Sequence, residues 1–66
     1  MTVTLNGSVT DLPDDISIHT MLTQKGFVPQ RVVVECDRVI IPRAQWQDTL
    51  VKNGAEVEVI AFVGGG

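Results

Sequence analysis

Residues 2–5 alternate polar and apolar side chains, which is the pattern of a strand with one buried face. The dipeptide Asn6-Gly7 follows, and both residue types tolerate the positive φ that a type I′ hairpin turn requires. We therefore predict a hairpin whose return strand runs from Val9 to Leu12. Val9 and Leu12 occupy an odd and an even position, so a regular strand would point these two apolar side chains to opposite faces. We therefore expect either a bulge or an early end to the pairing.

A helical period replaces this alternation after residue 16. Ser17 suits the N-cap of a helix, and Gly26 followed by Phe27 predicts a Schellman ending in which the aromatic ring packs back over the helix. A helix of about eight residues does not persist alone in water, so it is expected to lie against a sheet. Its apolar residues recur at i, i+3 and i+4 and share one face: Ile18, Met21 and Leu22.

The second half of the chain predicts further strands. Residues 31–37 are rich in β-branched side chains, and their alternation gives one inward and one outward face. A tight connection at 37–38 leads to the short apolar run 39–41, which Pro42 ends because proline cannot donate to a ladder. We expect Val32, Val34 and Cys36 on the inward face, and Arg31, Val33 and Glu35 on the outward face.

Residues 43–50 are expected to form a short helical turn that carries Trp46. Asn53-Gly54 predicts another turn, and residues 56–63 form the last strand, with Val57, Val59 and Ala61 on one side. A hairpin, a helix and further strands in so short a chain predict an α+β fold of the β-grasp, ubiquitin-like type. One mixed sheet of about four to five strands would pack on one main helix, with the first and last strands parallel at its centre. Residues 1–63 would form the domain and residues 64–66 a flexible tail beyond the sheet edge.

The composition of the chain excludes several classes of partner and site. The 66 residues are 44% hydrophobic and 20% charged, which is globular composition. A net charge of -3 with five scattered basic residues argues against nucleic-acid or anionic-membrane partners. Cys36 is the single cysteine, which excludes an internal disulfide, and with His19 as the single histidine no zinc or haem ligand set can be assembled. No apolar run approaches the ~20 residues of a membrane span, and the cytoplasm is the expected location.

Several conspicuous side chains have structural interpretations. Trp46 is expected to be a packing residue, Cys36 a small core hydrophobe, and His19 a solvent-facing residue of the helix. Asp14 and Asp15 precede the helix, where negative charge complements its dipole. No nucleophile, catalytic base or metal set is apparent, so we assign no catalytic residues and disfavour a free-standing enzyme.

The last strand changes character along its outward face. Glu56 and Glu58 come first and Ile60 and Phe62 follow, and Val33 extends this apolar stretch from the neighbouring strand. An apolar patch on a small domain indicates a docking surface. We therefore predict a partner-docking surface that also includes Val63. Arg43 either belongs to this surface, because arginine is enriched at binding hot spots, or shields the domain surface.

Three glycines, Gly64, Gly65 and Gly66, close the sequence. Without a Cβ they can thread a narrow channel in a partner. They cannot cradle a phosphate because no helix N-terminus follows, and the chain contains no P-loop. The alternative interpretation is a frayed end or a cloning scar.

The segment Ile41-Pro42-Arg43-Ala44-Gln45-Trp46, the Asn53-Gly54 turn and the ending Phe62-Val63-Gly64-Gly65-Gly66 resemble the ThiS-type sulfur carriers of thiamine biosynthesis. The likeness covers essentially the whole chain. Cys36-Asp37 departs from the small polar turn that such proteins often carry.

The resemblance implies a carrier that binds no cofactor. An E1-like adenylyltransferase of the ThiF type would use ATP to convert the Gly66 carboxylate into an acyl-adenylate. A persulfide sulfur donor would displace AMP and leave a thiocarboxylate, which a thiazole synthase of the ThiG type would consume. Alternatives of the same fold are the small subunit of molybdopterin synthase, a carrier for sulfur amino-acid synthesis, and a ubiquitin-like modifier that forms isopeptide bonds to lysines.

Overall fold

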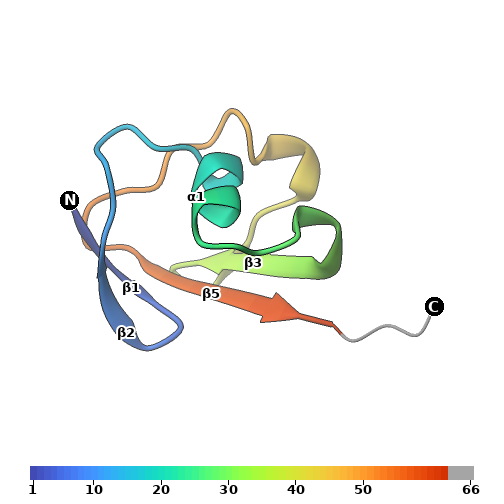
Figure 1. Cartoon of the computed structure of the whole chain (residues 1–66), viewed down its shortest axis with the longest axis horizontal. Helices are drawn as coiled ribbons and strands as arrows, with labels where there is room; N and C mark the ends of the chain where they lie inside the picture. Colours follow the sequence, from blue (N-terminus) through green and yellow to red (C-terminus); the bar gives the residue numbers. More distant parts are fainter. Residues whose placement is uncertain (63–66) are drawn as a thin grey trace.

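A computed structural model describes residues 1–62 as one mixed sheet with an α-helix on one face (Figure 1). This is the expected β-grasp fold. In chain order the elements are β1 (Thr2–Leu5), β2 (Ser8–Asp11), α1 (Ile18–Gln24), the 3-10 turn η1 (Pro29–Arg31), β3 (Val32–Cys36), β4 (Val39–Ile40), the 3-10 turn η2 (Arg43–Gln45) and β5 (Glu56–Ala61).

The sheet has five strands in the order β2-β1-β5-β3-β4. β1 pairs with β5 in parallel, and the other neighbours are antiparallel. The predicted parallel pairing of the first and last strands is therefore confirmed, and β5 is the central strand. Its C-terminal end points away from the hairpin (Figure 1).

The hairpin and the helix form as their local signals predict. Asn6 and Gly7 both have positive φ, at 50° and 82°. Ser17 caps α1 by accepting a hydrogen bond from the Thr20 N–H at 3.1 Å. Gly26 has a φ of 82°, and the Phe27 N–H donates to the Leu22 carbonyl at 2.9 Å, which is the Schellman bond.

One apolar core lies between the sheet and the layer formed by α1 and the segment after β4. Its side chains come from the inward faces of the strands, from the helix and from the connecting segments, and Trp46 is among the largest that are fully buried. Phe27, Cys36 and Ile41 are partly buried against it. The core residues are Val3, Leu5, Leu12, Ile16, Ile18, Met21, Leu22, Val32, Val34, Trp46, Val51, Ala55, Val57 and Val59.

Two expectations about strands need correction. The hairpin has neither a bulge nor an early end, because β2 runs from Ser8 to Asp11 and backbone hydrogen bonds continue to Met1 and Leu12. Val9 is exposed and Leu12 is buried, so the two residues lie on opposite faces of the sheet. Arg31 lies in η1 because Pro29 starts a 3-10 turn there, and β3 begins one residue later.

Two other expectations hold. Val57, Val59 and Ala61 share one side of β5, although Ala61 at the strand end is exposed. Asp14 and Asp15 precede α1, and the Asp14 carboxylate lies 3.2 Å from the amino group of Met1.

None of the helices within residues 1–62 has the length and apolar character needed to cross a membrane. The same residues hold no group of three or more His, Cys, Asp or Glu side chains arranged to bind a metal ion.

Candidate functional site

The C-terminal half of β5 is held from both sides. On one side the ladder with β3 continues past the strand end, because the Phe62 N–H donates to the Arg31 carbonyl at 3.0 Å. Phe62 therefore keeps the register of β5 and shares the outward side with Ile60. Four residues of the predicted site, Val63, Gly64, Gly65 and Gly66, lie outside the described residues.

On the other side, the side chain of Asn6 replaces a missing strand residue. β1 ends at Leu5 while β5 continues. The Asn6 Oδ1 atom accepts the Val59 N–H at 2.7 Å, and the Asn6 Nδ2 atom donates to the Val59 carbonyl at 3.3 Å. One amide thus satisfies both backbone groups of Val59 where the backbone of β1 no longer reaches.

Apolar side chains gather on the open face of the sheet, which is the face opposite α1. Val33 and Ile60 are directly paired across β3 and β5, and Ile60 and Phe62 are each 51% exposed. Ile40 pairs with Glu35 on the neighbouring strand, so it shares this face and is 61% exposed. We call Val33, Ile40, Ile60 and Phe62 the apolar patch. Exposed patches of this kind mark interaction sites in soluble proteins.

A shallow hollow of about 400 Å³ adjoins the apolar patch at the sheet edge. Val33, Ile40, Phe62 and Arg43 all line it, so the fold brings Arg43 beside three residues of the patch. Ile60 is not part of its wall. The hollow gives a partner side chain a place to enter, with a guanidinium at its rim.

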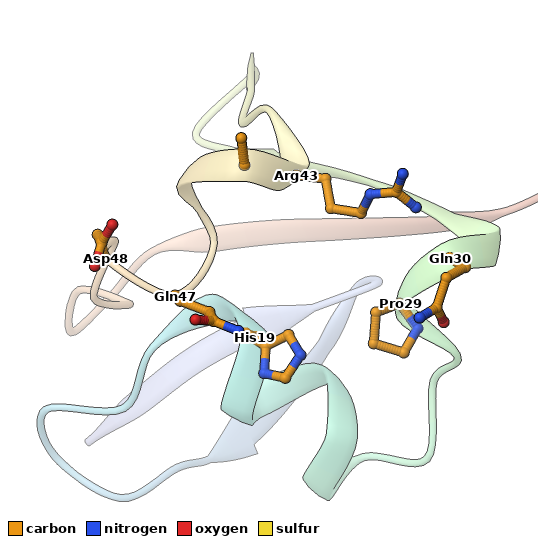
Figure 2. A pocket seen from close by; sticks show the side chains of 7 residues that line it. His19, Pro29, Gln30, Arg43, Gln47 and Asp48 are labelled. Atoms are coloured by element: carbon orange, nitrogen blue, oxygen red, sulfur yellow. The ribbon is translucent and has the colours of Figure 1, made fainter.

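Arg43 also lines a second hollow, of about 460 Å³, between α1, η1 and η2. Figure 2 shows its side chain extending from η2 toward Gln30 on η1, with His19 and Gln47 on the other side of the hollow. His19 is half-buried rather than fully solvent-facing. Its backbone N–H donates to the Trp46 carbonyl at 3.2 Å, which ties α1 to the end of η2.

Trp46 fixes the segment that presents Arg43. The indole is 2% exposed, and its Nε1 atom donates to the Ile41 carbonyl at 2.8 Å. The packing interpretation of Trp46 is therefore confirmed. A buried indole with a satisfied N–H anchors the turn between Pro42 and Trp46, and Arg43 at its surface takes its position from that anchor.

Acidic side chains occupy the rest of the open face on β3 and β5. Glu35 and Glu58 are direct cross-strand partners and both are half-buried. Glu56 lies two residues before Glu58 on the same side, and its N–H donates to the Asp37 carboxylate at 2.9 Å. We call Glu35, Glu56 and Glu58 the acidic band. The open face thus has an apolar end near the end of β5 and an acidic end near its start.

Cys36 is only half-buried, at the edge of the core rather than within it. Burial of the thiol, and secondly the neighbouring Asp37 carboxylate, raise its pKa above the ordinary value. A raised pKa keeps the thiol protonated near neutral pH, and the thiolate is the reactive form. Cys36 is therefore poorly suited to carry sulfur as a persulfide.

Sequence reasoning missed Ile40 and Asn6. The signal for Ile40 was present, because a two-residue turn at Asp37 and Arg38 sets the pairing of Ile40 with Glu35. Nothing local could have revealed the role of Asn6, because its partner Val59 lies 53 positions away in the sequence.

Comparison with known proteins agrees with this geometry. The sequence matches the ThiS family over residues 3–66. A crystal structure of the thiamine biosynthesis protein ThiS from Geobacter metallireducens superposes with a TM-score of 0.84 and 29% identity, covering 100% of both chains. A solution structure of a thiamine biosynthesis protein from the same organism has a TM-score of 0.80 and 30% identity, over 100% of this chain and 88% of the other.

Relatives of different length also match. A thiazole synthase of Paramagnetospirillum magneticum is 27% identical over all 66 residues, but the chain spans only 20% of that protein. A protein called ycf40 in Pyropia yezoensis, described as uncharacterized, is 29% identical over 100% of this chain and 93% of its own length. The family match covers nearly the whole sequence, and the fold of the described residues agrees with it. The chain therefore belongs to the ThiS family.

Proposed function

We propose that this chain carries sulfur as a thiocarboxylate on Gly66 and delivers it for formation of the thiazole ring. The observation that supports this most directly is the central position of β5, whose last described residues lie beside the apolar patch. A tail that continues from this strand beside a docking surface would reach the active site of an enzyme bound to that surface. Gly64 and Gly65 would pass through the channel because they carry no side chain.

Activation of the carboxylate must come from outside the chain. A carboxylate is a poor electrophile, and ATP supplies a better leaving group by forming an acyl-adenylate with release of pyrophosphate. An E1-like adenylyltransferase of the ThiF type is the proposed catalyst of this step. The terminal sulfur of a persulfide then attacks the carbonyl and displaces AMP. A further thiol cleaves the resulting acyl disulfide, which releases the thiocarboxylate and a new disulfide.

A thiazole synthase of the ThiG type is the proposed acceptor of the sulfur. The relatives in Paramagnetospirillum magneticum and Magnetococcus marinus support this, because each is named a thiazole synthase and includes a stretch similar to the whole of this chain. We place the exchange in the cytoplasm, where ATP is available to the adenylating enzyme.

The apolar patch, Arg43 and Val63 would form the docking surface for these partners. The exposure of Ile60 and Phe62 supports this role, as does the hollow that Arg43 and Phe62 share. Both partners use the same tail, so they would bind the carrier in turn rather than together.

Intact-mass spectrometry tests the proposal. The chain is incubated with ATP, the adenylyltransferase and a persulfide donor, and we expect replacement of one oxygen by one sulfur, mapped to Gly66. Gly66→Ala is the matched control, since the added methyl group should slow charging while the fold is retained. Absence of a mass change in the wild-type chain, or equal charging rates for the two chains, would contradict the proposal. Conjugates to lysine in place of the thiocarboxylate would indicate a protein modifier.

A further inference from the structure

Two glutamates face each other across the centre of the open face. Glu35 on β3 and Glu58 on β5 are register partners, and directly opposed like charges destabilise a sheet. Both side chains are half-buried, so water screens their repulsion less than at a fully exposed site. Glu56, on the same side of β5, adds a third negative charge nearby.

No ion pair within residues 1–62 involves this acidic band. Within residues 1–62 the single ion pair joins the amino group of Met1 and Asp14, at the other end of the sequence. The band also does not form a metal site, because no cluster of three or more suitable ligands occurs among the described residues. The acidic band therefore has neither an ion-pair partner nor a metal-binding cluster within the described part of the molecule.

The acidic band adjoins the apolar patch without a break. Val33 and Ile60 form the cross-strand pair next to Glu35 and Glu58, and Ile40 pairs with Glu35 on its other side. A partner that covers the apolar patch must therefore also cover at least part of the acidic band. Burying these carboxylates without partners would be unfavourable, so such a partner has to supply positive charge at this position.

We propose that the adenylyltransferase which binds the open face places arginine or lysine side chains over Glu35 and Glu58, beside its apolar contact with Val33, Ile40, Ile60 and Phe62. This inference rests on the proposed function and adds the chemistry of the partner surface to it. The unfavourable charge pair of the free carrier becomes a recognition element in the complex. Complementary charges also speed the encounter, and they do so most at low ionic strength.

The test is the double variant Glu35→Gln, Glu58→Gln, compared with the double variant Asp14→Asn, Asp15→Asn. Both remove two negative charges, but the second pair lies in the exposed loop between β2 and α1. Adenylation is followed by pyrophosphate release with the purified adenylyltransferase over a range of NaCl concentrations. We expect the glutamate variant to raise KM about tenfold at low salt, with kcat unchanged and a flatter dependence of KM on salt.

A second readout excludes a folding defect as the cause. Removing the repulsion should leave the thermal midpoint of the glutamate variant equal to or above that of the wild type. A chain that is at least as stable but binds more weakly has lost a contact with its partner. Equal KM values and equal salt dependence for the two double variants would overturn the inference. Failure of the proposed function itself gives a different result, because the wild-type chain would then show no adenylation at all.

Discussion

The two faces of the central strands have the same backbone but opposite surroundings. On the core face Val34 and Val57 have no exposed surface, whereas on the open face Ile60 and Phe62 are half exposed. Successive residues of one strand alternate between these faces. Stability and recognition are therefore separated within single strands, at neighbouring positions along the chain.

The difference shows how so small a domain can hold a large exposed apolar surface. α1 covers one face of the sheet (Figure 1), and no described element covers the other. The buried core lies on the helix side of the sheet, where the inward strand faces, α1 and the connecting segments supply its side chains. Changes on the core face should alter folding, and changes on the open face should alter binding.

The largest effect is expected from a charge placed on the core face. Val34→Asp buries an unpaired carboxylate and should destabilise the fold by about 4 kcal/mol or more, enough to unfold much of a domain this small. Ile60→Asp is the matched control on the open face and should lose under about 1 kcal/mol. Urea denaturation followed by circular dichroism measures both. Equal losses for the two variants would refute the separation of the faces.

A binding defect without a folding defect is expected from Phe62→Asp. The variant should weaken binding to the adenylyltransferase by about 2 kcal/mol, or about thirtyfold in Kd, while its melting curve stays close to that of the wild type. Isothermal titration calorimetry measures the affinity.

Val9→Asp is the matched control, because Val9 is 78% exposed on the far strand of the sheet. It should leave the affinity nearly unchanged. A large loss of stability in Phe62→Asp would instead assign Phe62 to the core.

A smaller effect is expected where the side chain of Asn6 continues the sheet. Asn6→Gly keeps the positive φ of the turn but removes both hydrogen bonds to Val59, and it should destabilise the fold by about 1–2 kcal/mol. Asn6→Asp retains the acceptor for the Val59 N–H and should lose less. Hydrogen exchange of the Val59 amide reports the same contact, and unchanged protection in Asn6→Gly would contradict its role.

The smallest effect is expected at Cys36, which is partly buried at the edge of the core. Cys36→Ala should leave the rate of sulfur charging unchanged, because the protonated thiol takes no part in it. Intact-mass measurements over time make the comparison. Loss of charging in the variant would show that sulfur passes through Cys36.

The pH dependence of stability offers a second test of this thiol. Its pKa is raised in the fold, so the contribution of Cys36 to stability is complete below the pKa of the unfolded chain. It is lost as pH rises through the folded pKa, because the unfolded chain ionises first. The free energy of unfolding of the wild type should therefore decrease above about pH 9, and Cys36→Ala should lack this component.

Much of the fold could be predicted because its signals are local. The Asn6-Gly7 turn, the Ser17 cap and the Gly26 ending each depend on a few adjacent residues, and each forms as expected. The exact ends of strands depend on more distant partners. Arg31 was assigned to the strand, whereas it ends the 3-10 turn η1 that precedes β3.

The candidate site was predicted only in part. Alternation correctly put Val33, Ile60 and Phe62 on one side of the sheet, but it did not add Ile40, whose position depends on the pairing of β3 with β4. The hollow shared by Arg43 and Phe62 likewise depends on the packing of Trp46. No periodicity in the sequence encodes such a contact.

The sequence by itself determined the strand and helix types, the turns, the alternation of the two faces and the family, because each depends on neighbouring residues or on a motif. Tertiary structure alone decided that the acidic band forms no ion pair within residues 1–62, and that Asn6 supports Val59. It also decided that Arg43 lies beside the apolar patch. These facts depend on which distant segments become neighbours, and the packing of the whole chain around its core sets that.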